Sequence, residues 1–238
     1  GWIGTSFYFI ALDLSLKKRE KMRDGVVGTT WEVHGGGFYH VEKFAVAPKE
    51  LPVDLVWFKW EAYLTWVTGF LLLILQFYLE AGAWMIDPSV LALEPWQAIG
   101  ISITSLAVGW FVYDALCRSP IGKRITLLAI IGFVWVLAAA YFYTHVFSER
   151  TALIHVGAFI GTIMAANVFA IIIPNQKKIT AALLAGDAPD PKYGEIGKQR
   201  SVHNTYLTLP VLVLMVSGHY PMLSGHPQAW LIVAFVIV

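Results

Sequence analysis

The side chains best suited to proton or metal chemistry are seven histidines, several of which border apolar stretches. His203 and His219 stand at the two ends of the apolar stretch 203–220, sixteen residues apart. A helix would separate them by roughly 24 Å, close to the roughly 30 Å of a bilayer's hydrocarbon core. Because polar groups inside membrane spans are costly and usually functional, the pattern predicts an imidazole near each face of a membrane.

The elements that position these histidines belong to an integral membrane protein. Hydrophobic residues make up 57% of the chain and charged residues only 14%, about half the charge of a soluble domain. The net charge of +1 leaves no basic face for a nucleic acid. The single cysteine, Cys117, excludes a disulfide framework and a CxxCH site for covalent haem.

The fold class is therefore an all-α transmembrane bundle, in one transmembrane domain over residues 1–238. Seven spans are predicted, of which the first and the last are expected to be incomplete. The polar stretches 25–58 and 174–202 are predicted to be loops, and Pro174 is expected to end a helix. Alternating residues around three glycines predict a small hairpin within 25–58, outside the bilayer. The predicted spans are 1–16, 60–79, 96–116, 125–147, 151–173, 203–220 and 228–238.

The distribution of Lys and Arg predicts the orientation of the bundle. Taken alternately, one set of loops holds sixteen of the seventeen Lys and Arg, and the other set holds only Arg150. By the positive-inside rule the first set, which includes 25–58 and 174–202, is cytoplasmic. The N-terminus is then outside, and the chain crosses the membrane several times.

Three histidines are expected at one level near the outer face: His145, His155 and His219. Imidazole binds haem iron, and helical bundles place such ligands on facing helices. The layer therefore predicts a haem b, with His155 and His219 as the iron ligands. The alternative is that each is an ordinary interfacial histidine with its ring in water.

The expected inner layer holds several polar residues and an unusual glycine run. The run His34-Gly35-Gly36-Gly37-Phe38-Tyr39 could let backbone amides approach an anion or a planar ligand. The alternative is that the glycines only make the turn of the hairpin. HGGG also occurs in esterases, but the G-x-S-x-G elbow is missing. Asp114 is expected to be a helix-end carboxylate beside Arg118. The other polar residues of this layer are Glu61, Asn167, His203 and Asn204.

Several runs of this sequence resemble a known family. WIGTSFYFIALD (2–13), HGGGFYHVEKFAVAP (34–48), WFKWEAYLTWVTGF (57–70), HVGAFIGTIMAANVFAIIIPNQKK (155–178) and RSVHNTYLTLPVLVLMVSGHYP (200–221) are similar to the membrane domain of the bacterial membrane-bound, cytochrome c-linked urate oxidase family. The resemblance implies eight helices in the bacterial inner membrane. It also implies oxidation of urate to 5-hydroxyisourate without hydrogen peroxide. Electrons would pass to haem c, on a C-terminal cytochrome domain or a partner protein beyond residues 1–238.

Urate is a planar, weakly acidic anion, so the inner layer is the expected substrate site. His203 or Glu61 would accept a proton as the electrons leave. Electrons would then cross to the outer face through the membrane haem. The residues expected to bind urate are His34, Gly35, Gly36, Gly37, Tyr39, Asn167, Arg200 and Asn204.

Other functions remain open at this point. A haem b quinol oxidoreductase subunit would use the same two layers. A non-catalytic membrane subunit of a respiratory complex would need no site. The expected protein partners are a second copy of the chain, in a homo-oligomer, or the other subunits of such a complex. A transporter would need a polar path through the midplane, where the chain is almost entirely aliphatic.

Overall fold

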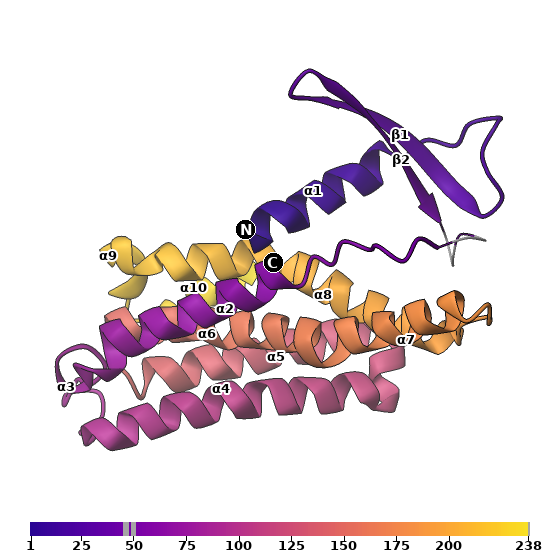
Figure 1. Cartoon of the computed structure of the whole chain (residues 1–238). Helices are drawn as coiled ribbons and strands as arrows, with labels where there is room; N and C mark the ends of the chain where they lie inside the picture. The colour runs from indigo at the N-terminus through magenta and orange to yellow at the C-terminus, as the bar shows by residue number, and fades with distance from the viewer. Residues whose placement is uncertain (45–47, 49–50, 238) are drawn as a thin grey trace.

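In this computed structural model, which describes residues 1–44, 48 and 51–237, long helices lie side by side in one bundle (Figure 1). Parts of the predicted loop 25–58 (45–47 and 49–50) and the last residue of the predicted span 228–238 lie outside the described residues. The α-helices are α1 (Trp2–Ser15), α2 (Trp60–Leu73), α3 (Ala81–Trp84), α4 (Pro95–Arg118), α5 (Ile125–Thr144), α6 (Glu149–Ala166), α7 (Ile173–Leu184), α8 (Pro191–Val216), α9 (Pro221–Ser224) and α10 (Ala229–Ile237).

Four helical segments are long and apolar enough to cross a membrane: Trp60–Tyr78, Pro95–Arg118, Ile125–Thr144 and Glu149–Leu184. The mainly helical membrane bundle is therefore supported, whereas seven spans are not confirmed. The remaining helices are too short or too polar to count as candidate spans. Helices α1 and α10 have only 14 and 9 residues, and α8 is long but begins with the polar run PKYGEIGKQR.

Pro174 does not end its helix, so this prediction was wrong. The π-helical segment η3 (Asn167–Ile172) joins α6 directly to α7, and Pro174 is the second residue of α7. A proline lacks the amide hydrogen that an ordinary α-turn uses, and π-turns are places where the helical hydrogen-bond pattern is already interrupted. The predicted loop 174–202 is consequently mostly helix, with only residues 185–190 between α7 and α8.

The predicted hairpin is confirmed. Strands β1 (Val26–His34) and β2 (Gly37–Phe44) pair antiparallel, with His34 opposite Gly37. Gly35 and Gly36 make the two-residue turn with φ values of 59° and 81°. Both values lie in the left-handed region that glycine occupies without strain, which is why this turn carries glycines.

Helix α6 forms the centre of the bundle. Helix α6 begins the continuous helix Glu149–Leu184, whose most apolar stretch is 61% buried, against 17–22% for those of the other three candidate spans. It packs against α4, α5 and α8, and its buried face includes Val156, Phe159 and Ile160. The outer helices leave many apolar side chains exposed, as helices that face lipid do.

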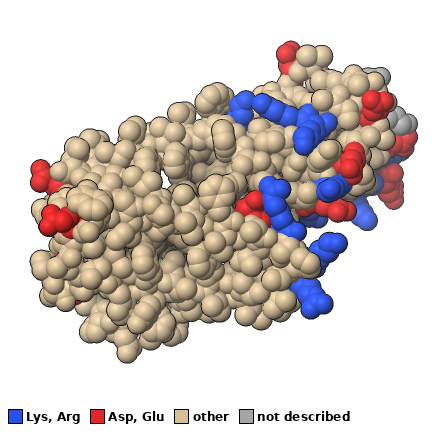
Figure 2. All heavy atoms as spheres, turned by 90° about the horizontal axis from the view of Figure 1, so that it is seen from below, with Lys and Arg blue, Asp and Glu red and all other residues tan. Residues whose placement is uncertain are grey.

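The two ends of the bundle differ in charge. Figure 2 shows Lys and Arg side chains gathered toward one end, while a broad band of the same face carries no charged side chain. That end carries the hairpin and the α7–α8 connection, and the opposite end carries α3 and α9 (Figure 1). The segregation that the sequence predicts is thus present in three dimensions.

Candidate functional site

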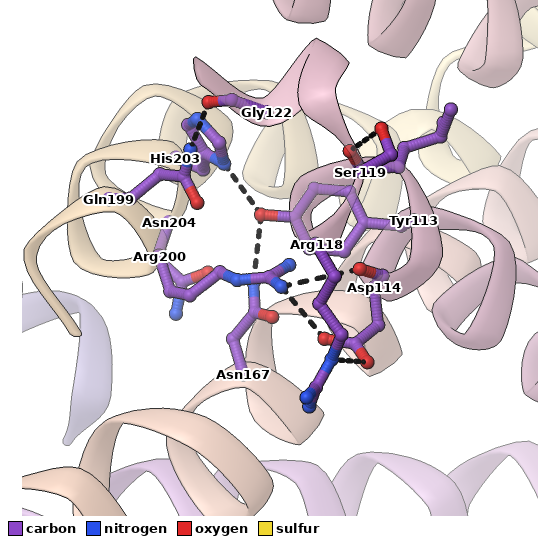
Figure 3. Close-up of polar contacts among 11 residues, drawn as sticks. Tyr113, Asp114, Arg118, Ser119, Gly122, Asn167, Gln199, Arg200, His203 and Asn204 are labelled. Atoms are coloured by element: carbon purple, nitrogen blue, oxygen red, sulfur yellow. Dashed lines mark hydrogen bonds and ion pairs between the residues drawn. The ribbon is translucent and has the colours of Figure 1, made fainter. Parts of the chain in front are cut away.

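A buried polar cluster forms where α4, η3 and α8 meet, toward the Lys/Arg-rich end. Helix α8 contributes one turn of polar residues, Arg200, His203 and Asn204, which the 3.6-residue period places on one side. Asn167 comes from η3 and is fully buried. We call the set Tyr113, Asp114, Asn167, Arg200, His203 and Asn204 the inner polar cluster (Figure 3).

Tyr113 is the hub of this cluster. Its phenol oxygen lies 2.6 Å from Nδ1 of His203 and accepts a hydrogen bond from Nδ2 of Asn167 at 3.2 Å. Because the amide nitrogen can only donate, the phenol is free to donate to His203. Asn167 Nδ2 also donates to Asn204 Oδ1 at 3.1 Å, and Asn204 donates to the backbone oxygen of Met164. Figure 3 shows these side chains pointing toward one another.

Arg200 is the charged element of the cluster and is only 1% exposed. Its Nη2 donates to Oδ1 of Asp114 at 2.7 Å, and Nε of Arg118 binds the other oxygen of the same carboxylate at 2.6 Å. The guanidinium carbon also lies 5.0 Å from the centre of the Tyr113 ring. One carboxylate therefore faces two guanidinium groups, which leaves this corner positively charged.

Three buried polar atoms of the cluster have no hydrogen-bond partner within the described residues: Arg200 Nε, Arg200 Nη1 and Asn167 Oδ1. Buried groups of this kind are costly to leave unpaired and are normally satisfied by water or a ligand. The Arg200 atoms are donors and the Asn167 atom is an acceptor. Together they offer two donors and one acceptor to a buried water or ligand.

The other residues predicted to bind substrate lie elsewhere. The run from His34 to Tyr39 forms the exposed end of the hairpin, with Tyr39 53% exposed. Glu61 lies in the first turn of α2, and its Oε2 is buried without a partner in the described part of the chain. Among the described residues no hydrogen bond, ion pair or ring contact joins them to the inner polar cluster, so their roles stay predictions.

His155, a predicted haem ligand, is enclosed in the core. It is 0% exposed, and aromatic rings of Phe77, Tyr143 and Phe147 surround it. Its Nδ1 lies 3.0 Å from the Thr151 carbonyl oxygen, and its Nε2 lies 2.8 Å from the Ser102 hydroxyl. Both ring nitrogens therefore have partners, and an iron atom bound at Nε2 would have to displace the Ser102 hydroxyl.

The other two histidines of the predicted haem site are exposed. The His145 ring stacks on Tyr141 at 4.0 Å, and its Nδ1 lies 2.7 Å from the Tyr141 carbonyl oxygen. His219 lies at the end of the short 3₁₀ segment Ser217–His219 and lines a cavity of about 600 Å³ between α2, α6 and α8. His155 does not line that cavity. The structure therefore does not bring His155 and His219 to one cavity.

Sequence reasoning missed Tyr113 and gave Asp114 only its local role. The pair Asp114–Arg118 follows from the i, i+4 spacing on a helix, and it is present. The link to Arg200 spans 86 residues and has no local signal. The one signal for Tyr113 in the sequence is its position next to Asp114, near the inner end of a predicted span.

Comparison with known proteins gives one match. The family model described as "Urate oxidase N-terminal" matches residues 1–238, which is the whole chain. No curated protein matches, and no solved structure matches. The chain belongs to the urate oxidase N-terminal family.

Proposed function

We propose that this chain is a membrane-bound oxidoreductase that oxidises urate to 5-hydroxyisourate at the inner polar cluster. The observation that carries the proposal is that one buried cluster holds both donors and an acceptor without hydrogen-bond partners in the described part of the chain. The donors are on Arg200 and the acceptor is on Asn167. Urate is a planar anion whose edges carry both carbonyl oxygens and N–H groups. Arg200 would bind a carbonyl edge and the negative charge, and Asn167 would accept from an N–H.

The reaction requires that protons and electrons leave together. Urate and one water give 5-hydroxyisourate, two protons and two electrons. Tyr113 and His203 supply a path for a proton, because a proton reaching the Tyr113 oxygen can be passed to Nδ1 of His203 at 2.6 Å. Asn167 and Arg200 hold the phenol in place from the other side.

The electron carrier would bind in the cavity that lies beside the inner polar cluster. Its lining includes Met164 and Thr208, and both residues hydrogen-bond to Asn204 of the cluster. On α6 the lining extends from Met164 to Arg150, roughly 21 Å along the helix. A carrier bound there would connect the inner polar cluster to the opposite end of the bundle.

Haem b is the proposed carrier, with His219 as its iron ligand. His219 has no hydrogen-bond partner within the described residues and lines the cavity together with Gly157, Gly161 and Gly218. A built Cβ on Gly161 would meet no atom within 4 Å, so this glycine leaves open space there. When bound, the haem would supply one-electron transfer to haem c on a cytochrome domain or partner. Neither His155 nor His145 lines this cavity.

The orientation forms part of the same proposal. The Lys/Arg-rich end would face the cytoplasm of a bacterium, and the N-terminus and the cytochrome would be on the outside of the inner membrane. The charge segregation of Figure 2 supports this orientation.

A single spectroscopic experiment tests the function. A reduced-minus-oxidised absorption spectrum of the purified protein would be recorded and then repeated after adding urate alone. We expect a haem b band that urate itself reduces. The variant His203→Gln should keep the band but slow its reduction, while the exposed control His226→Gln should behave as the wild type. A haem that urate leaves oxidised in the wild type would reject the urate proposal.

A quinone is the second candidate for the carrier. The cavity is lined mainly by apolar side chains, with few polar groups such as Gln76 and Thr162, as expected for a lipid-soluble ligand. Urate, water and quinone would give 5-hydroxyisourate and quinol, which balances without iron. Urate-dependent quinone reduction by protein that contains no haem would favour this candidate.

A further inference from the structure

The hairpin end, which the proposed oxidation does not use, carries an exposed apolar face. In an antiparallel pair, directly opposed residues share a face, so Trp31 with His40 and Val33 with Phe38 lie on the same side. Trp31 is 58%, Val33 68% and Phe38 74% exposed. Three large apolar side chains at one hairpin end form a contiguous patch of the kind that marks an interaction surface.

Two contacts determine where this patch lies along the bundle. Glu32, near the turn, accepts a hydrogen bond from Tyr8 in the middle of α1, at 3.0 Å. Lys43, at the other end of the hairpin, pairs with Asp13 in the last turn of α1, at 2.7 Å. The hairpin therefore crosses over α1, and its turn lies on the N-terminal side of the crossing and away from the bundle (Figure 1). Tyr8 is seven residues before Ser15, so the turn returns roughly 10 Å along the helix toward its N-terminus.

The surroundings of the patch are those of a membrane interface. Helix α1 exposes Phe7, Tyr8 and Phe9 along the same level. The segment between α1 and β1 carries Lys17, Lys18, Arg19 and Lys21, all exposed and without an ion pair among the described residues. Basic residues at the headgroup level next to an apolar, Trp-containing tip form the combination that binds anionic lipid.

We propose that the hairpin tip inserts into the lipid leaflet at the Lys/Arg-rich end of the bundle, with Lys17, Lys18 and Arg19 on anionic phospholipid headgroups. Trp31, Val33 and Phe38 enter the headgroup–acyl boundary, and the Gly35–Gly36 turn leads the insertion. The hairpin is thus a membrane anchor in addition to the membrane-crossing helices of the bundle. This replaces the expectation that it lies outside the bilayer.

The test uses spin labels on the protein in liposomes. Phe38→Cys and, as the matched aqueous control, Glu20→Cys would be labelled in a Cys117→Ser background; Val33→Cys is a second tip position. Collision rates with oxygen, which concentrates in lipid, and with a water-soluble nickel complex would be measured in phosphatidylglycerol-containing vesicles. We expect oxygen to dominate at position 38 and nickel to dominate at position 20.

The lipid charge provides the second readout. Removing phosphatidylglycerol, or substituting Lys17, Lys18 and Arg19 by Glu, should lower the oxygen-to-nickel ratio at position 38. Nickel access at position 38 equal to that at position 20 would overturn the proposal. So would dipolar broadening between labels at position 38 with poor access to both reagents, because it would show that a second copy of the chain covers the patch.

Discussion

The phenol oxygen of Tyr113 lies 2.6 Å from Nδ1 of His203, although ninety residues separate them in the sequence. The contact joins α4 to α8 and has Asn167 and Arg200 on its other side. In the proposed oxidation this pair moves the proton, so it should control turnover more than binding.

We expect Tyr113→Phe to lower the rate of urate oxidation by roughly 10²-fold or more, the usual contribution of a positioned acid or base. The ring and its contact with Arg200 remain, so the affinity for urate should change little. Steady-state kcat and KM with urate check this expectation. Tyr206→Phe is the control, because Tyr206 lies on the same helix as His203 and is 78% exposed. Equal rates in the two variants would remove Tyr113 from the proton path.

Asp114→Asn should destabilise the protein by about 3–5 kcal/mol, because it leaves the buried guanidinium of Arg200 without its counter-charge. The matched variant Arg118→Gln removes the other guanidinium on the same carboxylate. The Arg118 side chain is 64% exposed, so its loss should cost at most about 1 kcal/mol. Thermal unfolding midpoints in one detergent compare the two variants. Equal losses of stability in the two variants would contradict the expected difference between the buried Arg200 and the exposed Arg118.

Asn167→Ala should weaken urate binding by about 1–3 kcal/mol, or roughly 5- to 150-fold, since it removes the unpartnered acceptor Oδ1. Asn175→Ala serves as control, because Asn175 lies on the same continuous helix and has no hydrogen bond of its side chain within the described residues. Equilibrium binding of urate to the fully reduced protein, which has no site left to accept electrons from urate, gives both affinities. Unchanged affinity in Asn167→Ala would place urate elsewhere.

Gly109→Ala tests the packing of α4 on the central helix. A Cβ at Gly109 would lie 2.2 Å from Cε2 of Phe159, so we expect a loss of about 1–3 kcal/mol from overpacking. Gly100→Ala on the same helix meets nothing within 4 Å and should be neutral or stabilising by up to about 1 kcal/mol. Unfolding midpoints of the two variants decide the matter. A tolerated Gly109→Ala would show that Phe159 moves freely.

The sequence alone determined the features that depend on local spacing. Apolar runs predicted the helical membrane bundle, and four of the predicted spans are long and apolar enough to cross a membrane. Alternation around Gly35 and Gly36 predicted the hairpin, because left-handed turn positions favour glycine. Depth along a helix, counted at 1.5 Å per residue, placed Asn167, His203 and Asn204 at one predicted level. The structure joins them in one hydrogen-bonded network, in which Asn167 binds Asn204 directly and His203 through Tyr113.

Only the tertiary structure decided which side chains face each other at that level. Counting residues gives depth, but the rotation and packing of each helix come from contacts between distant segments. These contacts turn Arg200 onto Asp114 and Tyr113 onto His203, and they direct His155 into a closed aromatic pocket away from the cavity that His219 lines. The helix also continues through Pro174, where the preceding π-turn has already interrupted the α-helical hydrogen bonds.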